Sequence, residues 1–157
     1  MKRLKHSDGW VFHCTTDENA DAIFEGGMSC GSFADRPIDF CGTRWIAVKL
    51  EHVGEFSEHE YGGRKAIEPH WSRWRSAPGE PWVERFDNDG FPLYRTIPVE
   101  FLAETDKGGR VLRDVAEVDD KTRNLLLAAS FGELAEDFQL AARSLPGAAS
   151  PVNVLLP

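Results

Sequence analysis

Short apolar segments separated by polar stretches predict β-strands in most of the chain. Residues 9–15 and 45–50 are rich in the aromatic and β-branched residues that strands favour, and residues 82–86 alternate apolar and polar positions. The strand candidates are 9–15, 45–50, 82–86, 93–97 and 110–112. The stretches 28–43 and 51–63 are polar or rich in Gly, Ser, Asp and Pro, so we expect loops there.

A helix is predicted directly after the first strand. Thr15-Thr16-Asp17-Glu18 has the spacing of a capping box, which places the helix start at Thr15. Apolar Ala20, Ile23 and Phe24 then fall on one helical face, and Gly26-Gly27 ends the helix.

A second helical region is predicted over 122–145. A further capping box at Ser130–Glu133 indicates a break near Gly132. Beyond it, apolar residues recur in a stripe typical of core packing or a dimer contact: Phe131, Leu134, Ala135, Phe138, Ala141, Ala142 and Leu145. The mixed order of elements predicts a single α+β domain over 1–157, with a C-terminal helical segment over 119–146.

Composition narrows the class of protein. The chain has 157 residues, a length that suits one domain, and its 41% hydrophobic content is that of a globular protein. No apolar run approaches the roughly 18 residues of a membrane-spanning helix, so we expect a cytoplasmic protein with no membrane partner. Cys14, Cys30 and Cys41 match no zinc-binding spacing, and we expect three reduced thiols. The run of His and Glu between 52 and 60 lacks metal-ligand spacing, so we expect a solvated loop and no metal.

The charge is unevenly distributed. The net charge is −8, but residues 64–75 carry four basic residues against Glu68, a net of +3 that leaves −11 for the rest of the chain. Trp71 and Trp74 lie within this basic segment. The pattern fits either a surface helix with inward tryptophans or a contact with a phosphate-bearing ligand. The acidic remainder argues against duplex DNA as a partner and favours a nucleotide or another protein.

The strongest local candidate for a site is the junction between the first strand and the first helix. His13 ends the strand and Thr15 starts the helix, an arrangement in which both side chains could bond a ribose hydroxyl. Alternatively, backbone partners satisfy His13 and Thr15 only caps the helix.

This opening resembles that of the ADP-ribosyltransferase-like superfamily, in which a strand ends in His-x-Thr and a helix with A-x-x-I and a glycine follows. His13-Cys14-Thr15, Ala20-x-x-Ile23 and Gly26-Gly27 match that order. The resemblance implies a small split sheet over residues 9–105, followed by C-terminal helices, and NAD as a substrate.

The resemblance also implies roles for individual residues. His13 and Thr15 would contact the ribose on the nicotinamide side, and either Trp45 or Tyr61 would be the aromatic residue beside the nicotinamide. The family's later strand would correspond to 93–103, where Tyr94-Arg95-Thr96 stands in place of the catalytic Glu. The implied catalytic carboxylate is then Glu84 or Glu100, and Arg95 would face a phosphate.

The function implied is ADP-ribosyl transfer from NAD to a macromolecular acceptor, as in a toxin or a phage or host-modifying factor. Two alternatives stay open. One is a non-catalytic protein-binding module or homodimer that retains the fold. The other is an activity like that of the RNA 2′-phosphotransferases, which use His and Arg residues, here with Arg95 at the phosphate.

Overall fold

The computed structural model describes residues 2–39 and 41–133, and in this part of the chain the fold is α+β, as the sequence predicts. The strands of the main sheet pair antiparallel in the order β4-β5-β2-β1-β3-β8-β9. They are β1 (Trp10–Thr15), β2 (Phe33–Ala34), β3 (Arg44–Lys49), β4 (Phe56–Tyr61), β5 (Arg64–Pro69), β8 (Ala103–Thr105) and β9 (Val111–Arg113). A separate hairpin pairs β6 (Arg73–Trp74) with β7 (Val83–Glu84).

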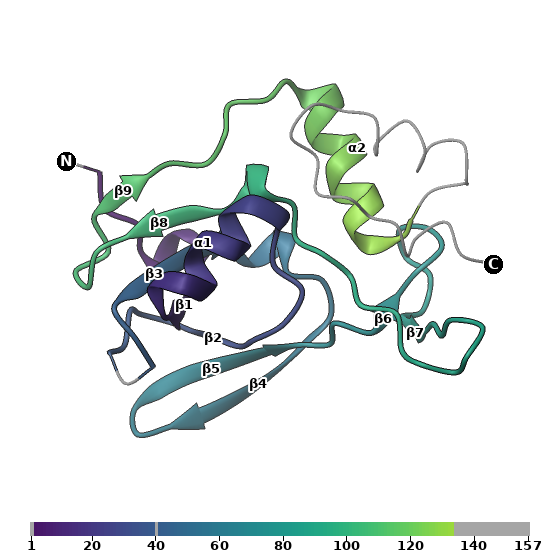
Figure 1. Ribbon diagram of the computed structural model, residues 1–157, viewed down its shortest axis with the longest axis horizontal. Helices are drawn as coiled ribbons and strands as arrows, with labels where there is room; N and C mark the ends of the chain where they lie inside the picture. The colour runs from purple at the N-terminus through teal and green to yellow at the C-terminus, as the bar shows by residue number, and fades with distance from the viewer. Residues whose placement is uncertain (1, 40, 134–157) are drawn as a thin grey trace.

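In the described part of the chain, two α-helices accompany the sheet. Helix α1 (Asp17–Gly26) lies across one face of the sheet, and α2 (Asp120–Phe131) lies beside hairpin β6–β7 (Figure 1). Residues 2–39 and 41–133 also contain three single turns of 3-10 helix: η1 (His6–Asp8), η2 (Leu50–His52) and η3 (Val99–Phe101). No helix in the described ranges has the length and apolar character needed to cross a membrane.

The helix boundaries follow from their caps. The hydroxyl of Thr16, not of Thr15, accepts a hydrogen bond from the Asn19 amide, so α1 begins one residue later than the capping-box pattern predicts. Helix α2 ends at Gly132, which adopts the left-handed conformation with φ of 70°, and this confirms the predicted break. The apolar stripe beyond it falls almost entirely outside the described residues.

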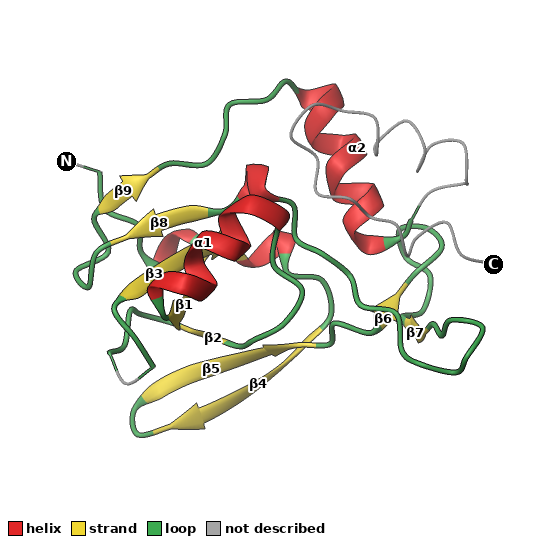
Figure 2. Cartoon of the chain, viewed as in Figure 1, coloured by secondary structure: helices red, strands yellow, loops and turns green. Residues whose placement is uncertain are grey.

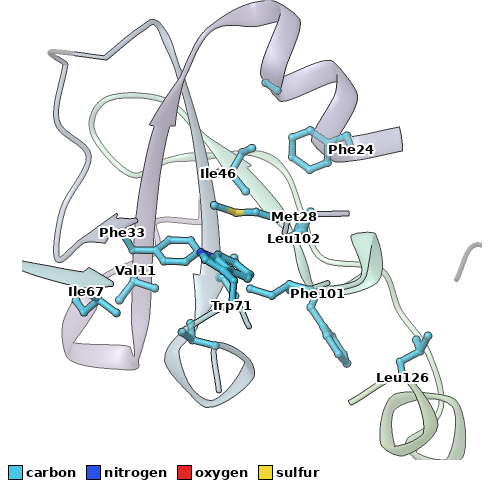
Figure 3. Packing of buried hydrophobic residues seen from close by; sticks show 14 residues of the cluster. Val11, Phe24, Met28, Phe33, Ile46, Ile67, Trp71, Phe101, Leu102 and Leu126 are labelled. Carbon is cyan, nitrogen blue, oxygen red and sulfur yellow. The ribbon is translucent and has the colours of Figure 1, made fainter. Parts of the chain in front are cut away.

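The sheet buries both of its faces in the region of β1 and β3. The larger apolar cluster joins Val11 and Ile46 of the sheet to Phe24 in α1, to Leu126 in α2 and to Met28, which follows α1 (Figure 3). A second cluster on the other face contains Leu4, Trp10, Phe12, Ala47 and Ala103. Because side chains alternate across a strand, burial of both faces explains why 10–15 and 45–49 read as continuous apolar runs.

The hairpin β4–β5 corrects two predictions. Residues 51–63 were expected to form a loop, and helix was one expectation for 64–75, yet β4 and β5 pair over their full length (Figure 2). Gly62 and Gly63 have φ of 53° and 80°, the left-handed conformation that a tight hairpin turn requires. Strand β4 lies at the edge of the sheet, largely exposed, so its polar sequence is the one expected of an edge.

Two further predictions need correction. Residues 93–97 form no continuous strand. The Leu93 amide donates to Arg85 O, the Arg95 amide donates to Trp71 O, and Ile97 forms an isolated antiparallel bridge with Met28. The expected loop 28–43 contains β2, which joins β1 to β5 and so carries the hairpin.

A fully buried arginine, Arg95, holds together the start of β4 and the end of β5, at the open end of the hairpin. The Arg95 guanidinium donates to the carbonyls of Val53 and His70, both at 3.1 Å, just before β4 and just after β5. Burial lowers the pKa of Arg95 to about 10, so it remains charged at neutral pH. Gly54 has φ of 84°, and a Cβ there would lie 2.5 Å from Arg95 Nη1.

We expect Gly54→Ala to destabilise the protein by about 3 kcal/mol, because it adds both left-handed strain and a collision with a buried charged group. Gly90→Ala is the matched control, since Gly90 has nearly the same φ of 85° with open space around it. Gly90→Ala should lower the free energy of unfolding by about 1 kcal/mol, the cost of the left-handed strain alone. Urea unfolding of both variants measures the difference, and equal losses would contradict the packing role of Gly54.

Candidate functional site

A hollow of about 180 Å³ opens between β1 and the hairpin β4–β5. It lies where the sheet parts: β2 pairs with β1 only through Phe12 and Ala34, so beyond Phe12 no described strand pairs with β1 on that side. Its lining consists of Phe12, His13, Cys14, Ser32, Phe33, Ala34, Ile38, Cys41, Tyr61, Arg64, Ala66 and Glu68. The hollow therefore brings the predicted site residues His13 and Tyr61 to one place.

The position of the His13 ring is fixed from two sides. Its Nδ1 lies 2.8 Å from the Ser32 carbonyl oxygen, so Nδ1–H donates and Nε2 is left as an acceptor. The ring meets Phe33 edge-on, with 6.0 Å between ring centroids. A Cβ at Gly31 would approach His13 Cε1 to 2.6 Å, so only glycine lets the backbone lie so close. Burial lowers the pKa of His13, which is therefore neutral at pH 7.

The hairpin supplies the opposite wall. Tyr61 and Arg64 are opposite each other in the β4–β5 register, and Glu68 shares their face of the hairpin. The Glu68 carboxylate lies 3.4 Å from His59 Nε2. The sequence prediction missed Arg64 and Glu68, although a period of two from 64 to 68 could have placed them on one face.

Two thiols also line the hollow. Cys14 donates to the Gly42 carbonyl at 3.4 Å, and the pKa of Cys41 is raised by burial and by the neighbouring Cys14 thiol. Cys14, Cys30 and Cys41 are all free cysteines, which agrees with the expectation from sequence. A protonated thiol is a weak nucleophile, so Cys41 adds an apolar wall and no reactive group at neutral pH.

Thr15 and Trp45, two of the predicted binding residues, lie outside the hollow. Both are buried, and Trp45 Nε1 donates to the Ile38 carbonyl. Trp45 is paired with Cys14 and is buried, and its ring is not among the side chains that line the hollow, so it offers no stacking surface there. Thr15 neither caps α1 nor reaches the hollow.

The predicted catalytic and phosphate-binding residues also lie elsewhere. Glu84 is exposed on β7, opposite Arg73, and Glu100 is buried in η3 with its Oε1 unpartnered among the described residues. Burial raises the pKa of Glu100, as expected for a carboxyl group in the core. Arg95 is fully buried with its guanidinium bound to backbone carbonyls, so it cannot face a phosphate as predicted.

No family model matches the chain, and no curated protein or solved structure matches it either. The assignment of a site therefore rests on the geometry of the described residues.

We expect His13 to titrate below its ordinary value of about 6.5, because the folded protein disfavours its charged form. Stability contributed by this group is then present above the unfolded pKa and decreases as pH falls through about 6.5 toward the folded value. A titration followed by NMR at the His13 imidazole measures the midpoint directly. A midpoint at or above about 6.5 would contradict the burial of the ring.

Proposed function

We propose that the hollow binds the nicotinamide-ribose end of NAD and that the protein transfers ADP-ribose to a macromolecular acceptor. The observation that supports this proposal is the presence of His13 and Tyr61, from strands that are not neighbours, in one hollow. A volume of about 180 Å³ is less than that of most sites for whole cofactors, so it suits one end of a dinucleotide. The resemblance of residues 9–27 to the ADP-ribosyltransferase-like superfamily points to the same ligand.

Each wall of the hollow offers a group suited to this ligand. The free Nε2 of His13 can accept a hydrogen bond from a ribose hydroxyl, and the exposed ring of Tyr61 can stack on the nicotinamide. Arg64 can attract a phosphate, because a guanidinium forms charge-assisted hydrogen bonds with phosphate oxygens.

Glu68 replaces Glu84 and Glu100 as the proposed catalytic carboxylate, since among the described residues that line the hollow it is the one with a carboxylate. In the reaction, the bond from ribose C1 to nicotinamide breaks and nicotinamide leaves with the electron pair. A carboxylate near the positive charge that develops on the ribose stabilises the transition state. The acceptor nucleophile then bonds to C1 and releases its proton to solvent.

We expect millimolar NAD to raise the melting temperature of the wild-type protein by several degrees, because a ligand at about 100 times its Kd stabilises by about 2.7 kcal/mol. His13→Ala and Tyr61→Ala should each lose most of this shift. Tyr94→Ala is the matched control, because Tyr94 is as exposed as Tyr61 but lies away from the hollow. An unchanged melting temperature of the wild type with NAD would refute the proposal and favour a protein-binding module.

Glu68→Gln separates binding from catalysis. The variant should keep the thermal shift with NAD but release nicotinamide about 100-fold more slowly, since the lost charge acts on the transition state. Nicotinamide is quantified by chromatography over time with the full chain. Equal rates for wild type and Glu68→Gln would exclude Glu68 as the catalytic carboxylate.

A further inference from the structure

A serine, a histidine and a glutamate form a continuous hydrogen-bonded chain at the other end of the hairpin. Ser57 Oγ lies 2.7 Å from His70 Nε2, and His70 Nδ1 lies 2.9 Å from Glu55 Oε1. Because an ionised carboxylate only accepts, Nδ1–H donates to Glu55, and Nε2 is free to accept the proton of Ser57. Both distances lie within the range of about 2.6–3.2 Å found between nucleophile, base and orienting acid in hydrolases.

The backbone holds these three residues in place. The His70 amide donates to the Glu55 carbonyl at 2.8 Å, which continues the β4–β5 pairing by one residue pair. Glu55 and Ser57 are two apart on one side of the hairpin, so their side chains share the face on which His70 lies. The buried Arg95 binds the His70 carbonyl from behind, and Arg73 donates to Glu55 Oε1 at 3.2 Å.

The position of Ser57 on an edge strand provides access. Ser57, Glu55 and His70 are half-buried, and β4 has β5 as its only neighbour in the described sheet. Hydrogen-bonded pairs alternate along an antiparallel ladder, so the pairing of 55 with 70 and of 57 with 68 turns the Glu58 amide to the free edge. The amide of the residue after the nucleophile is the oxyanion donor of one large hydrolase class.

We propose that Ser57, His70 and Glu55 form a second, esterase-type catalytic site whose substrates are small uncharged carboxylic esters. The acidic side chains of β4 disfavour anionic substrates, and Ser57 lies half-buried at the free edge of the described sheet, where a small ester can reach it. This site does not require NAD or the hollow at His13.

The step is an acyl transfer in two stages. Ser57 Oγ bonds to the ester carbonyl carbon while its proton passes to His70 Nε2, and the tetrahedral adduct expels the alcohol, which takes that proton. Water then attacks the acyl-serine, His70 again carries the proton, and the carboxylic acid leaves as Ser57 is restored. Glu55 touches neither substrate nor reacting atoms and is a positioning residue that stabilises the imidazolium.

Covalent labelling tests the proposal. The full chain is treated with a fluorophosphonate, which phosphonylates activated serines, and the labelled peptide is identified by mass spectrometry. We expect label on Ser57, with its rate lowered at least about 100-fold in His70→Asn, because the asparagine amide is too weakly basic to take the Ser57 proton. Ser72→Ala, which removes a half-buried hydroxyl near the hairpin, is the control and should label on Ser57 as the wild type does.

Turnover of p-nitrophenyl acetate gives a second measurement. Ser57→Ala should abolish the protein-dependent rate, and Glu55→Gln should lower kcat by about 100-fold with little change in KM, with recovery in Glu55→Asp. A structural role for Glu55 would not produce that recovery in kcat. Absence of label on wild-type Ser57, or equal hydrolysis by wild type and Ser57→Ala, would overturn the proposal.

Discussion

The buried guanidinium of Arg95 is the contact on which this half of the molecule depends. A charge inside a protein is costly unless polar groups surround it, and here the carbonyls of Val53 and His70 accept its hydrogen bonds. Three aromatic rings pack around it, with centroids 6.0 Å away for Trp71, 5.3 Å for Trp82 and 5.7 Å for Phe131. The Arg95 side chain thus joins the start of β4 and the end of β5 to the end of α2 and to the segment that carries β7.

The hairpin that Arg95 anchors carries both candidate sites on one polar face. At its closed end, Tyr61 and Arg64 face His13 across the hollow; at its open end, Ser57 and His70 form the hydrogen-bonded chain with Glu55. The two ends differ in chemistry because they differ in neighbours. The closed end faces β1 across the hollow, whereas the open end is held by backbone pairing and by Arg95.

The sequence predicted the elements that bury apolar surface and missed those that do not. Strands β1 and β3, helix α1 and the end of α2 were predicted because apolar residues and caps mark them directly. The edge strand β4 was missed because its exposed, polar sequence resembles a loop, and its pairing depends on a partner that local pattern cannot show.

The dependence on pairing between distant segments also explains which site residues the sequence predicts and which it misses. His13 was predicted from its own strand, and Tyr61 entered only through the resemblance to a family. Glu68 and the Ser57–His70 pair depend on the β4–β5 register, which no spacing within a single segment reveals. The resemblance to a family places Arg95 at a phosphate. Its burial depends on Trp71, Trp82 and Phe131, which are distant in sequence, so the local pattern does not predict it.

The basic and aromatic segment 64–75 has a structural role, because its contacts connect the surroundings of His70 at the open end of the hairpin with those of His13 at the hollow. Its tryptophans are buried, as one interpretation of the sequence expects, but Trp71 lies in the turn after β5 and Trp74 in β6, and neither is in a helix. Trp71 accepts the Arg95 amide on its carbonyl and donates from Nε1 to the Gly31 carbonyl at 2.9 Å. Gly31 in turn packs against the His13 ring. A continuous path of contacts therefore runs from Arg95, which binds the His70 carbonyl, through Trp71 and Gly31 to the His13 imidazole in the hollow.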